Sequence, residues 1–305
     1  MKRHIGFYRR RLAGLLCILS LLAATVLPAA AKETAVPAPE QEVMNILLIG
    51  RDAPAGTDHS RSDSILLCTF HADSNTLTMT SVLRDLYVPI PGHRSNRINA
   101  AYALGGTKLL KQTVEANFGV TADGSITVDF TRFPKLIDLL GGVTLELRAD
   151  EAAAINDSIA GNLTEGENLL TGAQALAYVR IRKLDKGGDF SRTNRQQKLL
   201  TALLDAYRSA SLPQILRLLK ETLSIVETDM DTGEILRSAR QLVPILSRLQ
   251  VKHQHIPAEG TYEYRTVRGM SVLSADLEAA RNLLQQTVNP PAEKTDAPAI
   301  RLLCF

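Results

Sequence analysis

Residues 178–197, YVRIRKLDKGGDFSRTNRQQ, contain four arginines whose spacing suits the binding of phosphate. Arg180 and Arg182 alternate with valine and isoleucine, which predicts an extended segment that carries both guanidinium groups on one face. A planar guanidinium stays charged and donates hydrogen bonds in pairs, so it matches the oxygens of phosphate. The alternative is a solvated basic surface in which these arginines pair with nearby aspartates, because runs of charge are usually solvated.

A second group of polar side chains follows the glycine pair at residues 187–188. A helix is expected to begin near Asp189, which can cap its first turn. Arg192, Arg195 and Gln196 then stand at positions i, i+3 and i+4, which share one face of a helix. Together the two segments predict a fork of guanidinium groups aimed across a glycine turn.

Two aspartates lie where the chain could hold a divalent cation. Asp52 follows the apolar run at residues 45–50, and Asp63 precedes the run at residues 64–70. The loop between them can fold Asp63 back toward Asp52, and Mg²⁺ needs few protein ligands when phosphate oxygens and waters complete its shell. The alternative is that both aspartates form turns or caps, which is common for aspartate beside loops.

Two further charged motifs lie at the ends of predicted elements. In residues 81–85, SVLRD, Arg84 and Asp85 follow a strand, where ligand sites of α/β proteins are found. They can equally form a surface ion pair. Residues 97–102, RINAAY, open a helix with Asn99 as its cap, so this motif by itself indicates structure.

Apolar periodicity predicts strands that alternate with helices. Strands are expected at residues 45–50, 64–70, 76–82, 125–130, 143–147, 251–256 and 262–267. Helices are expected at residues 107–118, 132–140, 171–178, 189–209, 213–226, 232–249 and 274–287. This order predicts an α/β fold, in which a mixed central β-sheet is covered by helices on both faces.

The N-terminal segment indicates export. Residues 1–11 are basic, and residues 12–31 form an uncharged apolar run long enough to cross a bilayer as a helix. Because the basic residues precede the run, residues 1–11 are expected in the cytoplasm and the body outside. We expect an uncleaved transmembrane anchor, and cleavage as a signal peptide near residues 29–31 is the alternative. A linker at residues 32–44 and a C-terminal tail at residues 289–305 are expected to flank the body.

Composition argues against several classes of function. The net charge is +3, and the basic leader accounts for more than that, so the body is nearly neutral and nucleic acid is not an expected partner. Cys17, Cys68 and Cys304 suggest neither a disulfide framework nor a metal site. The chain has no tryptophan that could stack on a sugar ring.

In combination and in order, six motifs resemble those of the LytR–CpsA–Psr family: NILLIGRD, SRSDS, SVLRDLYVPIPG, RINAAYALGG, LLTGAQALAYVRIR and GDFSRTNRQQ. The resemblance is strong from residue 45 to about residue 207 and weaker to about residue 288, so residues 45–288 are expected to form the catalytic domain of this family. The resemblance implies a membrane-anchored, extracytoplasmic phosphotransferase. Such enzymes move an anionic glycopolymer, for example teichoic acid or capsule, from a polyprenyl pyrophosphate carrier to peptidoglycan.

The resemblance also implies roles for individual residues. It implies Asp52 and Asp63 as ligands of Mg²⁺, or of Mn²⁺ in its place. It implies that the pyrophosphate contacts are made by Arg61, Arg84, Arg97, Arg180, Arg182, Arg192, Arg195 and Gln196, with Gln197 adjacent. Arg51 and Arg97 depart from the family, where a small polar residue and a lysine are frequent at these positions. A hydrophobic pocket for the polyprenyl tail is expected under the helices of residues 132–140 and 190–220.

The expected mechanism is attack by an acceptor hydroxyl on the phosphorus next to the glycan, with polyprenyl phosphate leaving. Arg84 and Arg182 would stabilise the developing charge, and Asp85 or Asp189 would take the hydroxyl proton. The expected partners are the lipid-linked glycan, a peptidoglycan acceptor and the cell membrane of a Gram-positive-type envelope. Two alternatives stay open: a hydrolase that uses water as the acceptor, and a non-catalytic regulator that binds lipid phosphate.

Overall fold

The computed structural model describes residues 43–52, 60–182, 184, 188–208, 210–235 and 242–290. The predicted membrane segment at residues 12–31, the linker up to residue 42 and the tail from residue 291 lie outside these described residues. Among the residues that the structure describes, no helix has the length and apolar character needed to span a bilayer.

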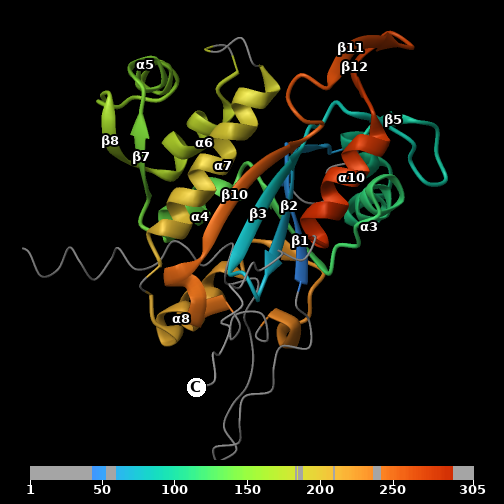
Figure 1. The fold of residues 1–305 in the computed structure, drawn as a ribbon. Helices are drawn as coiled ribbons and strands as arrows, with labels where there is room; N and C mark the ends of the chain where they lie inside the picture. Colours follow the sequence, from blue (N-terminus) through green and yellow to red (C-terminus); the bar gives the residue numbers. More distant parts are fainter. Residues whose placement is uncertain are drawn as a thin grey trace, which may run out of the picture.

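A six-stranded mixed sheet forms the centre of the molecule (Figure 1). In spatial order its strands are β10 (Gln250–Ile256), β3 (Thr76–Val82), β2 (Ser62–His71), β1 (Val43–Arg51), β6 (Gly124–Asp129) and β9 (Glu227–Thr228). Strands β1, β2 and β3 are antiparallel neighbours, whereas β6 runs parallel to β1 and β10 runs parallel to β3. The predicted mixed sheet is therefore confirmed.

Helices cover both faces of the sheet, as predicted (Figure 1). One face packs against α3 (Asn99–Phe118) and α10 (Leu277–Val288). The other packs against α4 (Arg132–Leu139), α6 (Gly172–Arg180), α7 (Asp189–Asp205) and α8 (Leu212–Thr222), with α5 (Ala149–Ser158) beside α6. In β1, Met44 and Ile46 enter the second core while Leu47 and Ile49 enter the first, because side chains alternate across a strand. Burial on both faces explains why this strand is a continuous apolar run.

Three two-stranded ribbons, a short helical segment at residues 232–235 and a 3₁₀ helix complete the described fold. The ribbons are β4 (Tyr87–Val88) with β5 (Asn96–Arg97), β7 (Val143–Leu147) with β8 (Gly166–Leu170), and β11 (Tyr262–Val267) with β12 (Met270–Ala275). The 3₁₀ helix η2 spans Val243–Arg248. The β11–β12 ribbon is joined to the body by a parallel bridge between Leu86 and Leu273.

Three predicted elements were wrong in type. Within the α-helix predicted at residues 232–249, Val243–Arg248 form the 3₁₀ helix η2. The segment around Arg180 is helical rather than extended, because α6 begins with a capping box between Thr171 and Gln174 and continues through Arg180. Residues 274–275 belong to β12, and the last helix starts only at Leu277, after the cap formed by the Asp276 side chain. Near Arg180 a short apolar alternation lies at the end of a helix, and at residues 274–275 a strand leads directly into a helix. In both of these cases the apolar periodicity does not show where one element ends.

Gly172 sets the spacing between α6 and α4. Its N–H donates a hydrogen bond of 2.7 Å to the carboxylate of Asp138 on α4. A Cβ atom at residue 172 would lie 1.9 Å from the carbonyl oxygen of Pro134, so a larger residue cannot occupy this position without moving a helix. The two helices therefore begin in backbone contact on the same face of the sheet.

Candidate functional site

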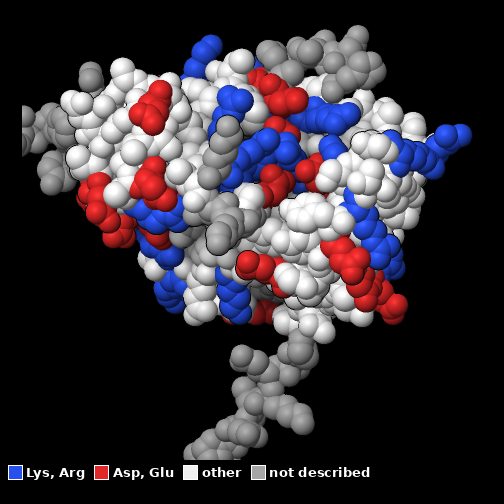
Figure 2. Space-filling view, turned by 90° about the horizontal axis from the view of Figure 1, so that it is seen from above, with Lys and Arg blue, Asp and Glu red and all other residues white. Residues whose placement is uncertain are grey.

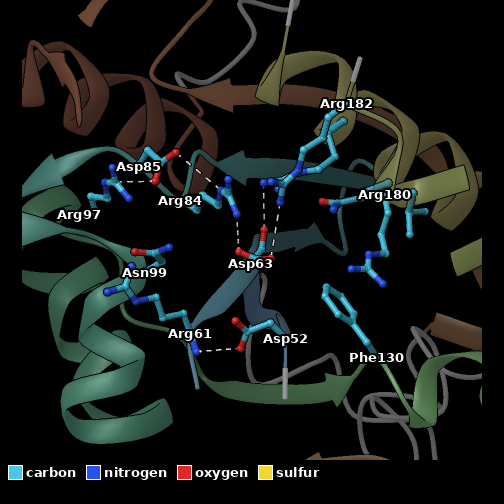
Figure 3. A pocket seen from close by; sticks show the side chains of 13 residues that line it. Asp52, Arg61, Asp63, Arg84, Asp85, Arg97, Asn99, Phe130, Arg180 and Arg182 are labelled. Carbon is cyan, nitrogen blue, oxygen red and sulfur yellow. Dashed lines mark hydrogen bonds and ion pairs between the residues drawn. The ribbon is translucent and has the colours of Figure 1, made fainter. Parts of the chain in front are cut away.

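A polar pocket of about 560 Å³ lies where β1, β3 and β6 end and α7 begins (Figure 3). Its lining residues are Asp52, Arg61, Asp63, Arg84, Asp85, Arg97, Asn99, Phe130, Val179, Arg180, Arg182, Arg192 and Gln196. Figure 2 shows basic and acidic side chains gathered at this end of the molecule. We call the six arginines and three aspartates of this lining, together with Asp189, the arginine pocket. The fold thus assembles side chains from most of the motifs that the sequence singled out.

Asp63 lies at the centre of the arginine pocket. Arg84 and Arg182 approach it from two sides, with Nη1 of Arg84 at 2.5 Å and Nη2 of Arg182 at 3.6 Å from its carboxylate oxygens (Figure 3). Arg192 donates a hydrogen bond of 3.1 Å to the Asp63 carbonyl oxygen. Arg84 follows β3, Arg182 follows α6, and Arg192 belongs to α7. All three arginines therefore contact Asp63 from different elements.

Asp189 orients two of these arginines. Its carboxylate accepts a hydrogen bond of 3.0 Å from Nη2 of Arg192 and lies 3.3 Å from Nε of Arg84. It was expected to cap α7, but Gly188 holds the cap position and no side chain bonds there. Asp189 is instead the first residue of the helix, and its carboxylate turns toward the guanidinium groups.

The charges in the arginine pocket are incompletely compensated. Burial lowers the pKa of Arg192 to about 10, and the nearby charges of Arg84 and Arg182 lower it as well, against the opposing effects of Asp189 and Asp63. For Arg84, burial lowers the pKa, but Asp189, Asp63 and Asp85 outweigh it and the net shift is upward. A guanidinium with a pKa near 10 is still charged at neutral pH, so an anion that enters would relieve repulsion around Arg192.

The two predicted metal ligands both line the pocket. The Asp52 carboxylate accepts hydrogen bonds from the Ser60 hydroxyl at 3.2 Å and from the Arg61 backbone N–H at 3.1 Å. Asp63 is paired with guanidinium groups. Within the described ranges, no group of three or more histidine, cysteine or acidic side chains could hold a metal ion by itself. Any ion at this site would therefore need oxygens from a ligand in addition to the two carboxylates.

Asp85, Arg97 and Asn99 form one end of the pocket. Nε of Arg97 lies 3.4 Å from the Asp85 carboxylate and also donates a hydrogen bond of 2.8 Å to the Ser271 carbonyl oxygen on β12. Asn99 was expected as a helix cap, yet it makes no cap bond, and its buried Oδ1 has no hydrogen-bond partner among the described residues. Its role as a lining residue was missed, because the motif alone reads as a helix start.

The opposite end of the polar pocket leads into an apolar groove of about 140 Å³. Phe130, Val179 and Gln196 line both, and the Arg180 guanidinium lies 5.0 Å from the centre of the Phe130 ring. The groove is otherwise lined by apolar residues of β1, β2, β6, α4, α6 and α7, including Phe133, Leu136, Ile137, Leu199 and Leu203. An apolar pocket under the helices of residues 132–140 and 190–220 is expected from the sequence, but its residues cannot be named from the sequence, since a groove and a core share one composition.

Two residues of the sequence motif lie outside the pocket. Arg195 is buried, and its Nε donates a hydrogen bond of 2.8 Å to Glu151 on α5. Gln197 donates to Ser81 Oγ at 2.9 Å beneath the sheet edge. On a helix, positions 195 and 196 lie about 60° and about 40° from position 192, on opposite sides of it, and in α7 only Gln196 lines the pocket. The expectation that Arg195 contacts the same ligand as Gln196 therefore has no support in the structure.

Arg51, which departs from the family pattern, also points away from the pocket. Its Nη2 lies 2.6 Å from Glu227 on β9 and 3.6 Å from the buried carboxylate of Asp129. Arg132 contacts the same two acids. These four residues connect the ends of β1, β6 and β9 through ion pairs. Arg51 therefore has a structural role outside the pocket.

The sequence matches the model of the LytR_cpsA_psr family over residues 24–288. It is 34% identical over 226 residues to "Regulatory protein MsrR" of Staphylococcus aureus (strain Mu50 / ATCC 700699), which covers 72% of this chain and 66% of MsrR. It is also 34% identical over 202 residues to the polyisoprenyl-teichoic acid–peptidoglycan teichoic acid transferase TagV of Bacillus subtilis (strain 168), which covers 64% of this chain and 52% of TagV. The chain thus matches between about half and two thirds of the length of these relatives.

Solved structures of TagT share the fold. TagT bound to LIIa-WTA has a TM-score of 0.68 and 28% sequence identity, and the match covers 85% of this chain and 95% of that one. TagT with bound octaprenyl pyrophosphate lipid has a TM-score of 0.63 and 26% identity, with the same coverage of 85% and 95%. These matches agree with the α/β class and with the central mixed sheet.

Proposed function

The chain belongs to the LytR–CpsA–Psr family, and from this premise we propose that it is an extracytoplasmic phosphotransferase that moves an anionic glycopolymer from a polyprenyl pyrophosphate carrier to peptidoglycan. The observation that supports this most is the junction of the arginine pocket with the apolar groove at Phe130, Val179 and Gln196. A lipid pyrophosphate has the same two parts, an anionic head and an apolar tail. The names of TagV, a teichoic acid transferase, and of TagT with bound octaprenyl pyrophosphate lipid support the same substrate class.

The pyrophosphate would bind among Arg84, Arg182 and Arg192, and the lipid tail would extend past Phe130 into the groove. Arg61, Arg97 and Arg180 line the same pocket and would contact the outer oxygens. Guanidinium groups that are already held in place stabilise charge as it develops on the phosphate oxygens without further rearrangement. Asp63 and Asp189 hold these groups through the contacts described above.

We propose that Asp52 and Asp63 hold Mg²⁺, for which Mn²⁺ could substitute. The donor set fits, since two carboxylates line one pocket with room for phosphate oxygens, and Mg²⁺ is usually bound by one or two carboxylates and substrate phosphates. When bound, the ion would neutralise charge on the phosphate oxygens. The guanidinium groups of Arg84 and Arg182 would then exchange part of their contact with Asp63 for contact with phosphate.

Of the two candidate bases, Asp85 is favoured by its position. It lies at the end of the pocket away from the groove, and attack takes place in line with the leaving oxygen. The leaving polyprenyl phosphate would depart toward the groove, so the acceptor hydroxyl would approach from the Asp85 end and give its proton to that carboxylate. Asp189, bound to Arg84 and Arg192, would act by orienting them.

The proposed location is the outer side of a cell membrane, with residues 12–31 as a single-pass anchor. The basic leader before this apolar run supports that orientation. Protease treatment of intact cells should then remove the body of the protein. A body that resists protease until the cells are lysed would contradict this topology.

The full chain in detergent, incubated with a labelled lipid-linked glycan, peptidoglycan oligomers and Mg²⁺, tests the activity. We expect label on peptidoglycan, loss of transfer on chelation, and recovery with Mg²⁺ or Mn²⁺. Label released only as free glycan phosphate would indicate a hydrolase, and binding without turnover a regulator.

Asp63→Ala separates the site from the scaffold in the same assay. Transfer and its dependence on Mg²⁺ should be lost, because one of two ligands is removed, while the melting temperature stays within a few degrees. Asp73→Ala is the matched control, since this exposed aspartate lies in the turn at the other end of β2. Equal transfer by both variants at limiting Mg²⁺ would remove the metal assignment.

A further inference from the structure

Three aromatic rings are stacked beside the arginine pocket. Phe190, the residue after Asp189, is buried, and its ring stacks on Tyr262 of β11 at 5.0 Å between centres. Tyr262 meets the edge of Tyr264 at 5.7 Å and 89°. Tyr264 itself is 63% exposed, the highest value among the large hydrophobic side chains of the described residues. A ring supported by two others is thus exposed to solvent, on the ribbon that is hydrogen-bonded to Asp85.

The β11–β12 ribbon is fixed to the pocket at the end that carries Asp85. The Leu273 N–H donates a hydrogen bond of 2.8 Å to the Asp85 carbonyl oxygen, and Arg97 donates through Nε and Nη2 to the Ser271 carbonyl oxygen. Burial raises the pKa of Tyr264, and Tyr262, Asp189 and Asp85 raise it further, so the hydroxyl lies within electrostatic reach of both carboxylates. The ribbon that carries Tyr264 is therefore hydrogen-bonded to Asp85 and Arg97, two residues that line the pocket.

We propose that Tyr264, supported by Tyr262 and Phe190, forms a saccharide subsite that holds a sugar ring of the glycan acceptor over the Asp85 end of the pocket. This inference rests on the proposed function. The face of a pyranose ring presents C–H groups that pack on an aromatic ring, and its rim presents hydroxyls that carboxylates and guanidinium groups can bind. A tyrosine supplies a rigid surface with one apolar face and one polar tip, which suits such a ring in a chain without tryptophan.

The position favours the acceptor over the donor sugar. The lipid groove opens from the pocket at Phe130 and Gln196, whereas the ribbon is bonded to Asp85 and Arg97 at the other end. In-line displacement requires the attacking oxygen to be opposite the leaving one. A ring stacked on Tyr264 would bring its hydroxyl in from the side of Asp85, where the proposed base lies.

Binding of a soluble peptidoglycan tetrasaccharide to the full chain in detergent tests the subsite without requiring turnover. We expect Tyr264→Ala to weaken binding roughly three- to tenfold, the size of an aromatic stacking contact. Tyr264→Phe and Tyr264→Trp should bind as wild type does, because the ring is kept. Since the chain has no tryptophan, Tyr264→Trp also provides a single reporter whose emission should shift when the saccharide binds.

Leu169→Ala, at an exposed apolar residue of β8, is the control and should bind as wild type does. The subsite is contradicted if wild type does not bind the saccharide, if Tyr264→Ala binds equally well, or if the emission of the Tyr264→Trp variant does not change. Weaker binding of the lipid-linked donor by Tyr264→Ala, with acceptor binding unchanged, would contradict the acceptor assignment. Binding that depends on Tyr264 in a protein without transfer activity would support the subsite and contradict the proposed function.

Discussion

The two sides of α7 carry arginines in opposite electrostatic situations. On one side Arg192 lies among the six arginines of the arginine pocket, which face four aspartates when Asp189 is included. On the other side Arg195 forms a buried ion pair with Glu151, and the two side chains are only 4% and 5% exposed. The pair is balanced, whereas the arginine pocket has an excess of two positive charges.

This difference distinguishes charge that supports the fold from charge that awaits a ligand. In a balanced pair each charge has an opposite charge beside it within the protein, as Arg51 and Arg132 have in Asp129 and Glu227. An excess of cations in an open pocket is mutually repulsive. Burial is the main cause of the lowered pKa of Arg192, and repulsion by Arg84 and Arg182 lowers this pKa further. That repulsion is tolerated where a bound anion removes it.

The largest expected effect comes from breaking the balanced pair. Arg195→Ala should lower the free energy of unfolding by about 3–5 kcal/mol, because the buried carboxylate of Glu151 loses its ion pair of 2.8 Å and keeps only the longer contact of 4.0 Å with Arg148. Replacing both residues by methionine should recover most of that loss, since apolar side chains of similar volume need no countercharge. Denaturant unfolding measures both, and an Arg195→Ala variant as stable as wild type would contradict the structural role.

Arg182 should behave in the opposite way. Its side chain is 47% exposed, so Arg182→Ala should leave the melting temperature nearly unchanged. Transfer should fall by about ten- to 150-fold in kcat/KM, which corresponds to about 1.5–3 kcal/mol for a hydrogen bond to a charged group. Arg182→Lys should recover only part of the rate, because an ammonium keeps the charge and loses the paired geometry.

If Arg182→Lys and Arg182→Ala both kept near-native rates, Arg182 would belong to a solvated surface and not to the phosphate site. Thermal melting of the same preparations excludes misfolding as the cause of a lower rate. Arg265→Ala is a suitable control, because this exposed arginine of β11 pairs only locally, with Glu263. It should change neither rate nor stability.

An anion should stabilise the excess charge without any mutation. Inorganic pyrophosphate at ten times its Kd should raise the free energy of unfolding by about 1.4 kcal/mol, by mass action on the folded state. The shift should shrink as salt is added, because the pocket is open to solvent and its charges are screened. Thermal melting of wild type and of Arg192→Ala makes the test: equal shifts in both would mean that pyrophosphate binds elsewhere.

The smallest expected effect concerns His255, a half-buried group near the end of β10 whose ring lies 5.4 Å from that of Phe190. Burial lowers its pKa, and the charge of His253 lowers it further while Glu259 opposes this. Because the folded-state pKa is below the unfolded value of about 6.5, its contribution to stability is complete above pH 6.5 and is lost as pH falls toward the folded-state pKa. Unfolding at pH 7.5 and 5.5 should show a smaller pH dependence for His255→Gln than for wild type; an unchanged dependence would assign it to other groups.

The sequence predicted the central sheet and the members of the pocket better than their arrangement. Strands β1 and β2 are buried on both faces, so their apolar runs are unambiguous, and the charged residues at their ends mark the pocket. The sequence does not show that Arg195 and Gln196 face different surroundings, because both positions lie within about 60° of position 192 around a helix. Only the partner decides, and Glu151 lies 44 residues away in the chain.

Other parts of the site depend on contacts between distant segments. Asn99, at the start of α3, and Phe130, after β6, line the pocket because segments distant in the sequence pack together. Local sequence patterns do not show such packing. The aromatic stack on β11 is not predictable for the same reason: Phe190 and Tyr262 are 72 positions apart, and the pattern of residues 274–275, which belong to β12, favours a helix. Packing between the start of a helix and a ribbon that is distant in the sequence leaves no periodic pattern of residues.

The absence of a side chain at Gly172 has a consequence for how this scaffold can change over evolutionary time. Helices α4 and α6, which touch there, are also two walls of the apolar groove. Adding one methyl group at this position would act as a wedge and move the walls apart, although no groove-lining residue had been altered. The width of the groove thus depends on a residue outside the groove. A single substitution at this position could change the thickness of the lipid that the groove admits, while the residues of the arginine pocket stayed the same.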